Sequence, residues 1–369
     1  MEKIDFCIVG GGVVGLLTAR EILLNNPEAS VAILEKNPFL GEESSARNSG
    51  VMHAGLYYPF RSQKHLLCLE GKKLWENLAP ELNISIDWCG KWIVAANHET
   101  EQLIEGLFAT AQKNGVEGLR WGEKSELEEI TPFVNVRRAF LSPKTGILSP
   151  SEVIRSLDRE VHRLGAMILS KQKLINLKKI EDGFVITSTN DEFLAETVIN
   201  CGGGFAPMVR SLLGLKDIES VWVKGCYLKL NKPFYNKRLI YPIPPRDLKG
   251  LGVHTSFDLD RVIRFGPNTI DVEKYEMSVP ETLVDEMYPY VVELFPNIKK
   301  TDLSIDYCGI RSKIKKDGKL YTDFLIQSPI KNYVEALGIE SPGLTASPAI
   351  AKKILNIIKE QGRANAQDL

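Results

Sequence analysis

Residues 3–35 read KIDFCIVGGGVVGLLTAREILLNNPEASVAILE, and this stretch decides the fold of the chain. The apolar run at 3–9 predicts a buried strand, residues 14–25 have the apolar spacing of a helix, and 30–34 predict a second strand. A strand, a helix and a second strand in this order form one βαβ unit. We therefore expect a Rossmann-type sheet and an α/β class for this part of the chain.

Three glycines at the junction of the first strand and the helix form the pattern GxGxxG: Gly10, Gly12 and Gly15. The first allows a tight turn, the second lets a diphosphate approach the backbone, and the third lets helix and strand pack closely. The helix N-terminus then offers free N–H groups and a partial positive charge to the anion. Glu35, at the end of the second strand, can accept hydrogen bonds from ribose hydroxyls. The pattern predicts a dinucleotide, with further contacts from Val14 and Lys36, but does not choose between FAD and NAD.

The composition describes a globular chain of 369 residues, 44% hydrophobic and 25% charged, which is long enough for two lobes. The formal net charge is −1, and no run of Lys and Arg can follow a phosphate backbone, so nucleic acid is excluded as the main partner. Six scattered cysteines without a CxxC pair indicate a reduced, cytoplasmic interior and no metal site. No apolar run reaches the roughly 18 residues that a bilayer requires, which leaves only peripheral attachment to the inner face of the membrane.

The segments that follow the βαβ unit change in character. Residues 37–58 are rich in Gly, Ser and Asn and predict an extended loop that touches a ligand, and 64–78 return to helical spacing. Short runs rich in Ile, Val, Trp, Tyr and Phe at 85–96 and 220–265 suit an antiparallel sheet. Two amphipathic helices are expected at 101–114 and 281–296.

No linker divides the chain, so the two lobes are expected to be interleaved. The nucleotide domain is predicted to consist of 1–85, 150–215 and 305–369. The substrate domain, an α+β lobe built on the antiparallel sheet, is predicted to consist of 86–149 and 216–304.

Residues 44–58, SSARNSGVMHAGLYY, are the most informative stretch, because small and polar side chains let the backbone pass close beneath a large flat ring. The stretch resembles the D-amino-acid-oxidase-like (DAO) superfamily of flavoproteins, and in particular the L-2-hydroxyglutarate dehydrogenase/oxidase branch, whose members carry a similar N-S-G-V-x-H-x-G-x-Y-Y pattern. Further matches extend over the whole chain: Lys64 with Cys68, NCGG at 200–203, KG at 224–225, GVH at 252–254, GPN at 266–268, GIR at 309–311 and GIESPGLT at 338–345.

The resemblance implies FAD in the Rossmann-type domain, and no Cys or His has the spacing used for covalent attachment, so noncovalent FAD is expected. NAD is also disfavoured because the residues after Glu35 do not continue as further βα units. The implied flavin contacts are Ser45, Asn48, Ser49 and Gly50 beside the diphosphate and ring, Leu174 at the adenine, Cys201, Gly202, Gly309 and Arg311, and Pro342, Gly343, Leu344 and Thr345 at the pyrimidine end.

The implied reaction is oxidation of a 2-hydroxy acid, with L-2-hydroxyglutarate as the expected substrate and 2-oxoglutarate as the product. This chemistry needs a cation for the carboxylate, a base for the hydroxyl proton and a flavin to accept hydride. Arg311 corresponds to the arginine with which relatives bind the carboxylate, although it could instead be an exposed member of the basic run 311–316. His53, in the flavin loop, is the expected base and His254 the second candidate, because imidazole titrates near neutrality.

Three further side chains are candidates that also have structural explanations. Tyr57 and Tyr241 could orient the substrate, although aromatic side chains in such a sheet are more often core residues. Lys224 could bind a second carboxylate, but a surface lysine is nearly as common there. The remaining histidines, His65, His98 and His162, are expected to be structural, on helix surfaces or in loops.

Different functions on this scaffold stay open. An amine or amino acid oxidoreductase is disfavoured, because 338–343 lacks the arginine-bearing H-F-R-x-G-like turn of many amine-oxidising members. A glycerol-3-phosphate oxidoreductase and a non-catalytic flavin-binding protein are equally compatible with the cofactor pattern. The electron acceptor, oxygen or a quinone, depends on access to the ring and is not encoded in a motif.

Overall fold

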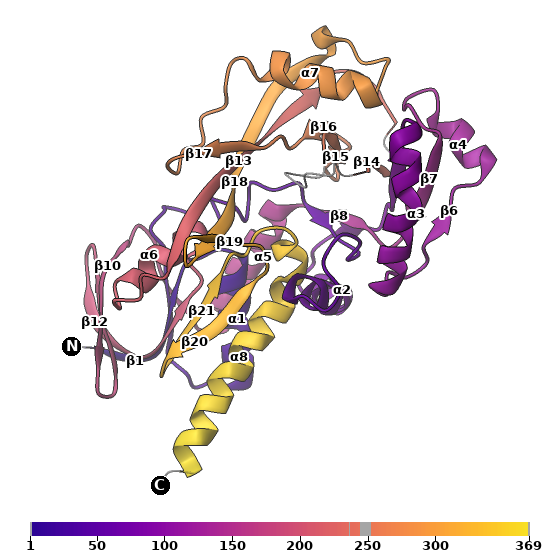
Figure 1. The fold of residues 1–369 in the computed structure, drawn as a ribbon. Coiled ribbons are helices and arrows are strands. Elements are labelled where there is room, and N and C mark those ends of the chain that lie inside the picture. Colours follow the sequence, from indigo (N-terminus) through magenta and orange to yellow (C-terminus); the bar gives the residue numbers. More distant parts are fainter. Residues whose placement is uncertain (1, 236, 244–251, 368–369) are drawn as a thin grey trace.

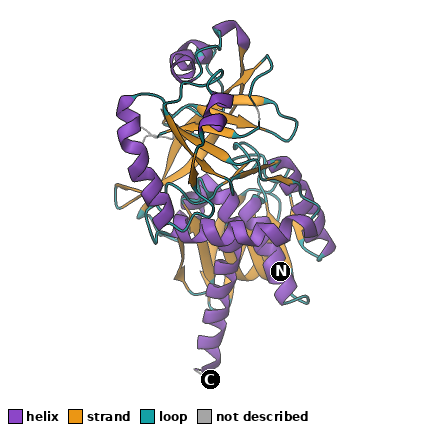
Figure 2. Cartoon of the chain, turned by 90° about the vertical axis from the view of Figure 1, so that its right-hand side faces the viewer, coloured by secondary structure: helices purple, strands orange, loops and turns teal. Residues whose placement is uncertain are grey.

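The computed structural model describes residues 2–235, 237–243 and 252–367. Two lobes share the chain (Figure 1): one contains the N-terminal strand and the long C-terminal helix, and the other contains the sheets above them. Figure 2 shows strands in the middle of both lobes and helices over their outer surfaces. Part of the expected sheet at 220–265, namely 236 and 244–251, lies outside the described residues.

The first lobe is built on an eight-stranded sheet with the parallel order β21-β12-β1-β2-β9 at its centre. The predicted strands at 3–9 and 30–34 are β1 (Lys3–Val9) and β2 (Val31–Leu34), which confirms the βαβ unit. The remaining strands are β9 (Met167–Leu169), β10 (Leu174–Ile180), β11 (Gly183–Ser188), β12 (Glu192–Asn200), β20 (Leu325–Ile330) and β21 (Tyr333–Leu337). One edge of β12 pairs first with β11 and then with β21, because each covers only half of its length.

Helices α1 (Val13–Asn25), α2 (Gln63–Glu81), α5 (Pro150–Arg163) and α8 (Gly343–Gln367) pack together against this sheet. They share one hydrophobic core with β1 and β2, in which Trp75 is fully buried. The Trp75 indole also donates a hydrogen bond of 3.1 Å to the carbonyl oxygen of Leu344, so α2 holds the first turn of α8. Two short helical segments, at Gly203–Phe205 and α6 (Ala206–Ser211), follow β12.

The second lobe differs from the single antiparallel sheet expected from 85–96 and 220–265. A six-stranded sheet contains β13 (Ile218–Leu230), β15 (His254–Phe257), β16 (Ile263–Gly266), β17 (Ile270–Val272), β18 (Leu303–Lys316) and β19 (Lys319–Tyr321). A separate four-stranded sheet contains β5 (Lys91–Ala95), β6 (Arg120–Trp121), β7 (Arg138–Ser142) and β14 (Leu239–Pro242). The prediction was wrong for β14 and β5, which pair in parallel, because strand composition does not specify direction when the partners are far apart in the chain.

A small third sheet joins β3 (Val51–Met52), β4 (Ile86–Asp87) and β8 (Gly146–Leu148). The helices expected at 101–114 and 281–296 are confirmed as α3 (His98–Lys113) and α7 (Leu283–Leu294), and a short helix α4 (Lys124–Ile130) lies between β6 and β7. No helix of the described residues combines the length and apolar character needed to cross a membrane.

All strands of the eight-stranded sheet come from the three segments proposed for the nucleotide domain. The proposed boundary at 305, however, falls inside β18, which pairs with β13 from the Leu303–Leu230 end to the Lys316–Ile218 end. The sheet of the second lobe therefore extends to Lys316, and a boundary at 305 divides a continuous strand.

A buried ion pair joins α6 to β21, between Arg210 (4% exposed) and Glu335 (0% exposed). Arg210→Met is expected to lower the free energy of unfolding by about 3–5 kcal/mol, because it leaves the Glu335 carboxylate buried without its cation. Urea denaturation of the FAD-loaded protein measures this effect. The double variant Arg210→Met/Glu335→Gln should recover much of the loss, and a cost below about 1 kcal/mol for the single variant would show that the pair contributes little.

Candidate functional site

The glycine turn brings β1, β12 and α1 into backbone contact. Gly10 has φ +106°, and a Cβ atom there would lie 2.4 Å from the carbonyl oxygen of Cys201. A Cβ atom on Gly15 would lie 2.0 Å from the carbonyl oxygen of Gly10. Only glycine fits at both positions, as the tight turn and the close helix–strand packing require. Gly12 directly precedes α1. Because glycine has no side chain, it does not cover the free N–H groups at the start of this helix.

The N-terminus of α1 has the character of an anion site. The N–H of Val13 donates to the Ser45 hydroxyl over 3.0 Å, so the loop after β2 already brings a hydroxyl to this helix end. Val14, in the same turn, is half-buried and packs against the core of the lobe. Backbone N–H groups, a helix N-terminus and a hydroxyl are the groups that hold a diphosphate.

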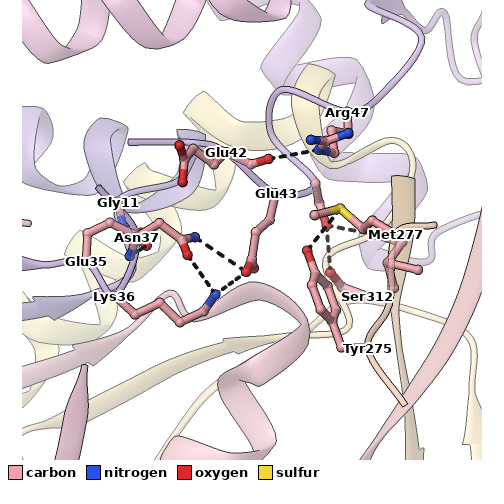
Figure 3. A network of polar contacts seen from close by, with 12 residues as sticks. Gly11, Glu35, Lys36, Asn37, Glu42, Glu43, Arg47, Tyr275, Met277 and Ser312 are labelled. Atoms are coloured by element: carbon pink, nitrogen blue, oxygen red, sulfur yellow. Dashed lines mark hydrogen bonds and ion pairs between the residues drawn. The ribbon is translucent and has the colours of Figure 1, made fainter. Parts of the chain in front are cut away.

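Glu35 lies at the carboxyl end of β2, as predicted (Figure 3). Its two carboxylate oxygens accept hydrogen bonds from the N–H groups of Gly11 (2.9 Å) and Asn37 (2.8 Å). Burial raises the pKa of Glu35 although both hydrogen bonds oppose the shift. Each carboxylate oxygen has a second lone pair for a ribose hydroxyl.

A cavity of about 650 Å³ adjoins Glu35 at the seam between the lobes. Its wall includes Glu42 and Arg47 from the loop after β2, and Tyr275 and Tyr307 from the second lobe. Lys36, on the same wall, forms an ion pair with Glu43 (Figure 3). Its Nζ also lies 4.5 Å from the centroid of the Phe205 ring. The Lys36 ammonium group therefore already has a partner within the protein. We expect the Lys36 backbone, rather than its side chain, to contact a nucleotide.

The loop at 44–50 is fixed between the two lobes by its own polar contacts. The Asn48 amide donates to the carbonyl oxygens of Ser44 (3.0 Å) and Ser45 (2.8 Å) and accepts from the N–H of Gly50 (2.9 Å). All three bonds lie within the loop, so this side chain shapes the loop. Gly50 has φ +65°, which turns the chain into β3, and Ser49 interacts with the hydroxyl of Tyr227.

Strand β18 lies directly against this loop. The Ser44 hydroxyl donates to the carbonyl oxygen of Ile310 over 2.9 Å, and the Tyr307 hydroxyl donates to the carbonyl oxygen of Asn48 over 2.8 Å. A Cβ atom on Gly309 would lie 2.1 Å from the carbonyl oxygen of Arg47. The glycine is therefore required for the close approach of the two backbones.

The turn at 338–345 lies at another edge of the site, between α2 and β18. Glu340 pairs with Lys64 of α2 (2.8 Å) and Lys313 of β18 (3.0 Å). Burial opposes ionisation of Glu340, but the two lysines lower its pKa. After Pro342, α8 begins at Gly343, and the first N–H groups of a helix have no partner within the helix. Leu344 and Thr345 thus present donors where the resemblance implies the pyrimidine end of a flavin.

Two other predicted contacts lie at the carboxyl edge of the parallel sheet. Cys201 and Gly202 follow β12, and the N–H of Gly202 donates to the side-chain oxygen of Asn200 over 3.2 Å. Leu174 opens β10, two residues after Gln172, whose N–H donates to the carbonyl oxygen of Glu35 over 2.8 Å. Both segments lie beside the glycine turn and Glu35, at the edge where open parallel sheets bind ligands.

His53, the expected base, is buried beside the turn at 338–345. Its backbone N–H donates to the Thr345 hydroxyl over 3.0 Å, and its Nε2 lies 3.2 Å from the Ser341 hydroxyl. Burial lowers the pKa of His53 to about 3, and the positive charge of Lys91 adds to the effect. The imidazole is therefore neutral at pH 7 and able to accept a proton.

His254 and Tyr241 come together from β15 and β14, with ring centroids 3.8 Å apart. The Nδ1 of His254 lies 2.9 Å from the carbonyl oxygen of Gly252. A carbonyl only accepts, so Nδ1 carries the proton and Nε2 has the free lone pair. Burial lowers the pKa of His254 to about 3, and Lys91 and Arg311 contribute to the shift.

The guanidinium of Arg311 is half-buried and is not an exposed member of a basic run. It donates to the carbonyl oxygens of Lys224 (3.3 Å) and Asn268 (3.0 Å), which leaves several of its five N–H donors for a ligand. Lys224 is buried rather than on the surface, and its ammonium group pairs with Glu276 and donates to the carbonyl oxygen of Ser278 over 2.8 Å. The protein therefore already satisfies Lys224, unlike Arg311.

Sequence reasoning missed Lys91, which is fully buried in this cluster. Its Nζ lies 4.3 Å from the Tyr241 ring centroid and 4.9 Å from that of Tyr57. The one indication in the sequence is a lysine at the start of the apolar run KWIVA, which is β5 and is buried throughout. A lysine at a strand end is usually exposed, and so the run alone did not single it out.

The other histidines have no role at this site. His65 is buried rather than on a helix surface: its Nδ1 accepts from the N–H of Arg61 (3.0 Å) and its Nε2 contacts the carbonyl oxygen of Asn114 (2.9 Å). The bond to Asn114 holds α2 against the end of α3, and the bond from Arg61 fixes the start of α2, so the predicted structural role fits its position. His98 and His162 are exposed, as expected.

A Rossmann-type lobe with a diphosphate turn and a buried imidazole–arginine cluster against its cofactor loop define the class of two-lobed dinucleotide-dependent oxidoreductases. The family model for FAD-dependent oxidoreductases of the DAO family matches residues 5–356, and the chain belongs to this family. The glycine turn, the Glu35 carboxylate and the α8 N-terminus fit FAD, the cofactor of this family.

Curated relatives cover almost the whole chain. The mitochondrial L-2-hydroxyglutarate dehydrogenase of Arabidopsis thaliana is 32% identical, over 96% of this chain and 83% of the relative. The L-2-hydroxyglutarate dehydrogenase of Escherichia coli is 28% identical, over 96% and 93%. Among solved structures, the FAD-bound L-α-glycerophosphate oxidase of Mycoplasma pneumoniae superposes with a TM-score of 0.89 at 24% identity, over 97% and 95% of the two chains. The last similarity establishes the fold.

Gly10→Ala is expected to yield protein with at least about tenfold less bound FAD, because the new methyl group collides with backbone at the diphosphate turn. Absorbance of the flavin relative to total protein measures it. The control is Gly106→Ala, in α3, where a Cβ atom meets no heavy atom within 4 Å. Equal FAD content in both variants would contradict the role given to this turn.

Proposed function

We propose that this protein oxidises L-2-hydroxyglutarate to 2-oxoglutarate. The observation that carries the proposal is the cluster of Arg311, His53 and His254, which combines a carboxylate-binding cation with two neutral imidazoles beside the cofactor loop. The relatives named above support the choice of this 2-hydroxy acid. Bound FAD supplies the acceptor for the hydride that leaves the substrate carbon.

Arg311 is proposed to bind the carboxylate next to the reacting carbon. Two residues earlier, Gly309 contacts the cofactor loop, so a carboxylate on the guanidinium lies close to the position proposed for the flavin. A guanidinium can grip a carboxylate with two parallel hydrogen bonds, which fixes the orientation of the carbon between them and the ring. Tyr57 and Tyr241 narrow the site and exclude water.

His53 is proposed to take the hydroxyl proton, and His254 is the second candidate. Both are neutral at pH 7, because burial lowers both pKa values to about 3. His53 has the stronger claim, since its backbone and side chain contact Thr345 and Ser341 in the turn proposed for the flavin. His254 belongs to the second lobe, and its Nε2 has a free lone pair that could accept the proton.

We further propose noncovalent FAD and a cytoplasmic location. All six cysteines are free and buried, which supports a reducing compartment. Oxygen and a quinone are the two candidate electron acceptors. A quinone would require attachment to the inner face of the membrane, through a peripheral contact.

Anaerobic absorbance of the purified holoenzyme tests the substrate. L-2-Hydroxyglutarate is expected to bleach the long-wavelength flavin band, whereas D-2-hydroxyglutarate, L-lactate, glycerol 3-phosphate and amino acids should bleach it slowly or not at all. Bleaching by glycerol 3-phosphate or an amino acid instead would replace the proposed substrate and keep the enzyme class. A yellow protein that no compound bleaches would refute the proposed oxidation.

Arg311→Ala is expected to retain the flavin spectrum and to lose about 2–4 kcal/mol of transition-state binding, seen as a lower kcat/KM for L-2-hydroxyglutarate. Arg311→Lys, which keeps the charge but not the planar fork, should recover only part of the loss. Steady-state kinetics of both variants measure these effects. Unchanged kinetics in Arg311→Ala would remove this residue from the substrate site.

A further inference from the structure

Lys91 is a buried cation for which the proposed reaction gives no role. It is 0% exposed and is the first residue of β5, between Leu239 of β14 and Ser142 of β7. Among the described residues, its Nζ has no hydrogen-bond partner and forms no ion pair with a carboxylate. A buried ammonium group without a partner is costly, and a ligand carboxylate could supply that partner.

A second unpaired group lies beside it. The Tyr57 hydroxyl is buried and, within the described part of the chain, also has no hydrogen-bond partner. Lys91 Nζ lies over the rings of both Tyr57 and Tyr241, and Tyr241 is stacked on His254. Two unsatisfied donors therefore lie in the same buried cluster that contains the imidazole of the proposed site.

The described neighbours of Lys91 supply no negative charge. The titratable residues that interact with Lys91 in the described structure are His53, Tyr57, Cys68, Cys89, Tyr241 and His254. Burial holds all of them in the neutral form at pH 7, because it lowers the pKa of the histidines and raises that of the thiols and phenols. Within the described part of the chain, no neighbour supplies an anion to Lys91, and a ligand carboxylate would supply one.

Lys91 and Arg311 both lower the pKa of His254, so both cations lie near the same imidazole. We propose that Lys91 determines the preference for a dicarboxylate: its ammonium group binds the carboxylate farther from the reacting carbon, while Arg311 binds the nearer one. This inference rests on the proposed oxidation of a 2-hydroxy acid. The Tyr57 hydroxyl donates to the same distal carboxylate.

Lys224 is the rival for this role and is less suited to it. It is nearly as deeply buried as Lys91, at 4% exposed, but its ammonium group already has a carboxylate and a carbonyl oxygen as partners. A second carboxylate at Lys224 would have to compete with Glu276. Lys91 has no such competitor among the described residues.

Paired substrates test the proposal. L-2-Hydroxyglutarate and L-2-hydroxyvalerate have carbon chains of the same length, and only the first has the distal carboxylate. Lys91→Met in the holoenzyme is expected to lower kcat/KM for L-2-hydroxyglutarate by about 100-fold or more and to change that for L-2-hydroxyvalerate by less than about threefold. The matched control Lys224→Met should keep the wild-type ratio between the substrates. An equal loss of kcat for both substrates in Lys91→Met, as for a base, or a change of ratio only in Lys224→Met, would overturn the proposal.

The wild-type enzyme offers a test that needs no variant. Burial lowers the pKa of Lys91 to about 7, and a lysine is charged only below its pKa. The KM for L-2-hydroxyglutarate should therefore rise above pH 7, by up to about tenfold per pH unit, while that for L-2-hydroxyvalerate stays level. A parallel pH dependence for the two substrates would overturn the assignment even if Lys91→Met does not fold. Failure of the proposed function itself looks different, because then neither acid bleaches the wild-type flavin.

Discussion

The close approach of β18 to the loop at 44–50 is the constraint on which the site depends. Only glycine fits at position 309 against the carbonyl oxygen of Arg47, and hydrogen bonds from Ser44 and Tyr307 fix the register on both sides of it. The contact joins the lobes and determines how far the six-stranded sheet lies from the loop at 44–50. Arg311 follows two residues after Gly309 on the same strand. The backbone contact at Gly309 therefore fixes the distance between the Arg311 backbone and the loop at 44–50.

Burial determines the charge state of the site. The two imidazoles are forced into the neutral form, and the same low-polarity surroundings strengthen any interaction between a cation and a bound carboxylate. The two buried lysines, Lys91 and Lys224, differ in whether the protein supplies a partner for the ammonium group. Lys224 pairs with Glu276, whereas the ammonium group of Lys91 has no hydrogen-bond partner in the described structure and lies over the Tyr57 and Tyr241 rings. The two carboxylates of the proposed substrate would neutralise the positive charges of Arg311 and Lys91.

Much of the nucleotide lobe could be predicted, because its determinants are local. The strand at 3–9, the helix that starts after the glycines and the acid at Glu35 are consecutive in the chain, and Gly10 and Gly15 are each required by a contact with neighbouring backbone. The second lobe could not be predicted to the same depth. Its strands were recognised, but β14 pairs in parallel with β5, about 150 residues earlier, and β18 continues past the expected boundary. Pairing between distant strands leaves no periodic pattern in either segment.

The sequence by itself therefore determined the glycine turn and a dinucleotide site, since residue type and short spacing specify both. Its resemblance to the DAO superfamily implied FAD and the histidine and arginine candidates. Only the tertiary structure decided which lysine is unpaired, that His53 and His254 are both neutral, and that Asn48 is used to shape its loop. The physical reason is that burial and partnership belong to the space around a side chain. The strands β5, β14, β15 and β18 surround these side chains. Their separation along the sequence does not indicate how close they lie in space.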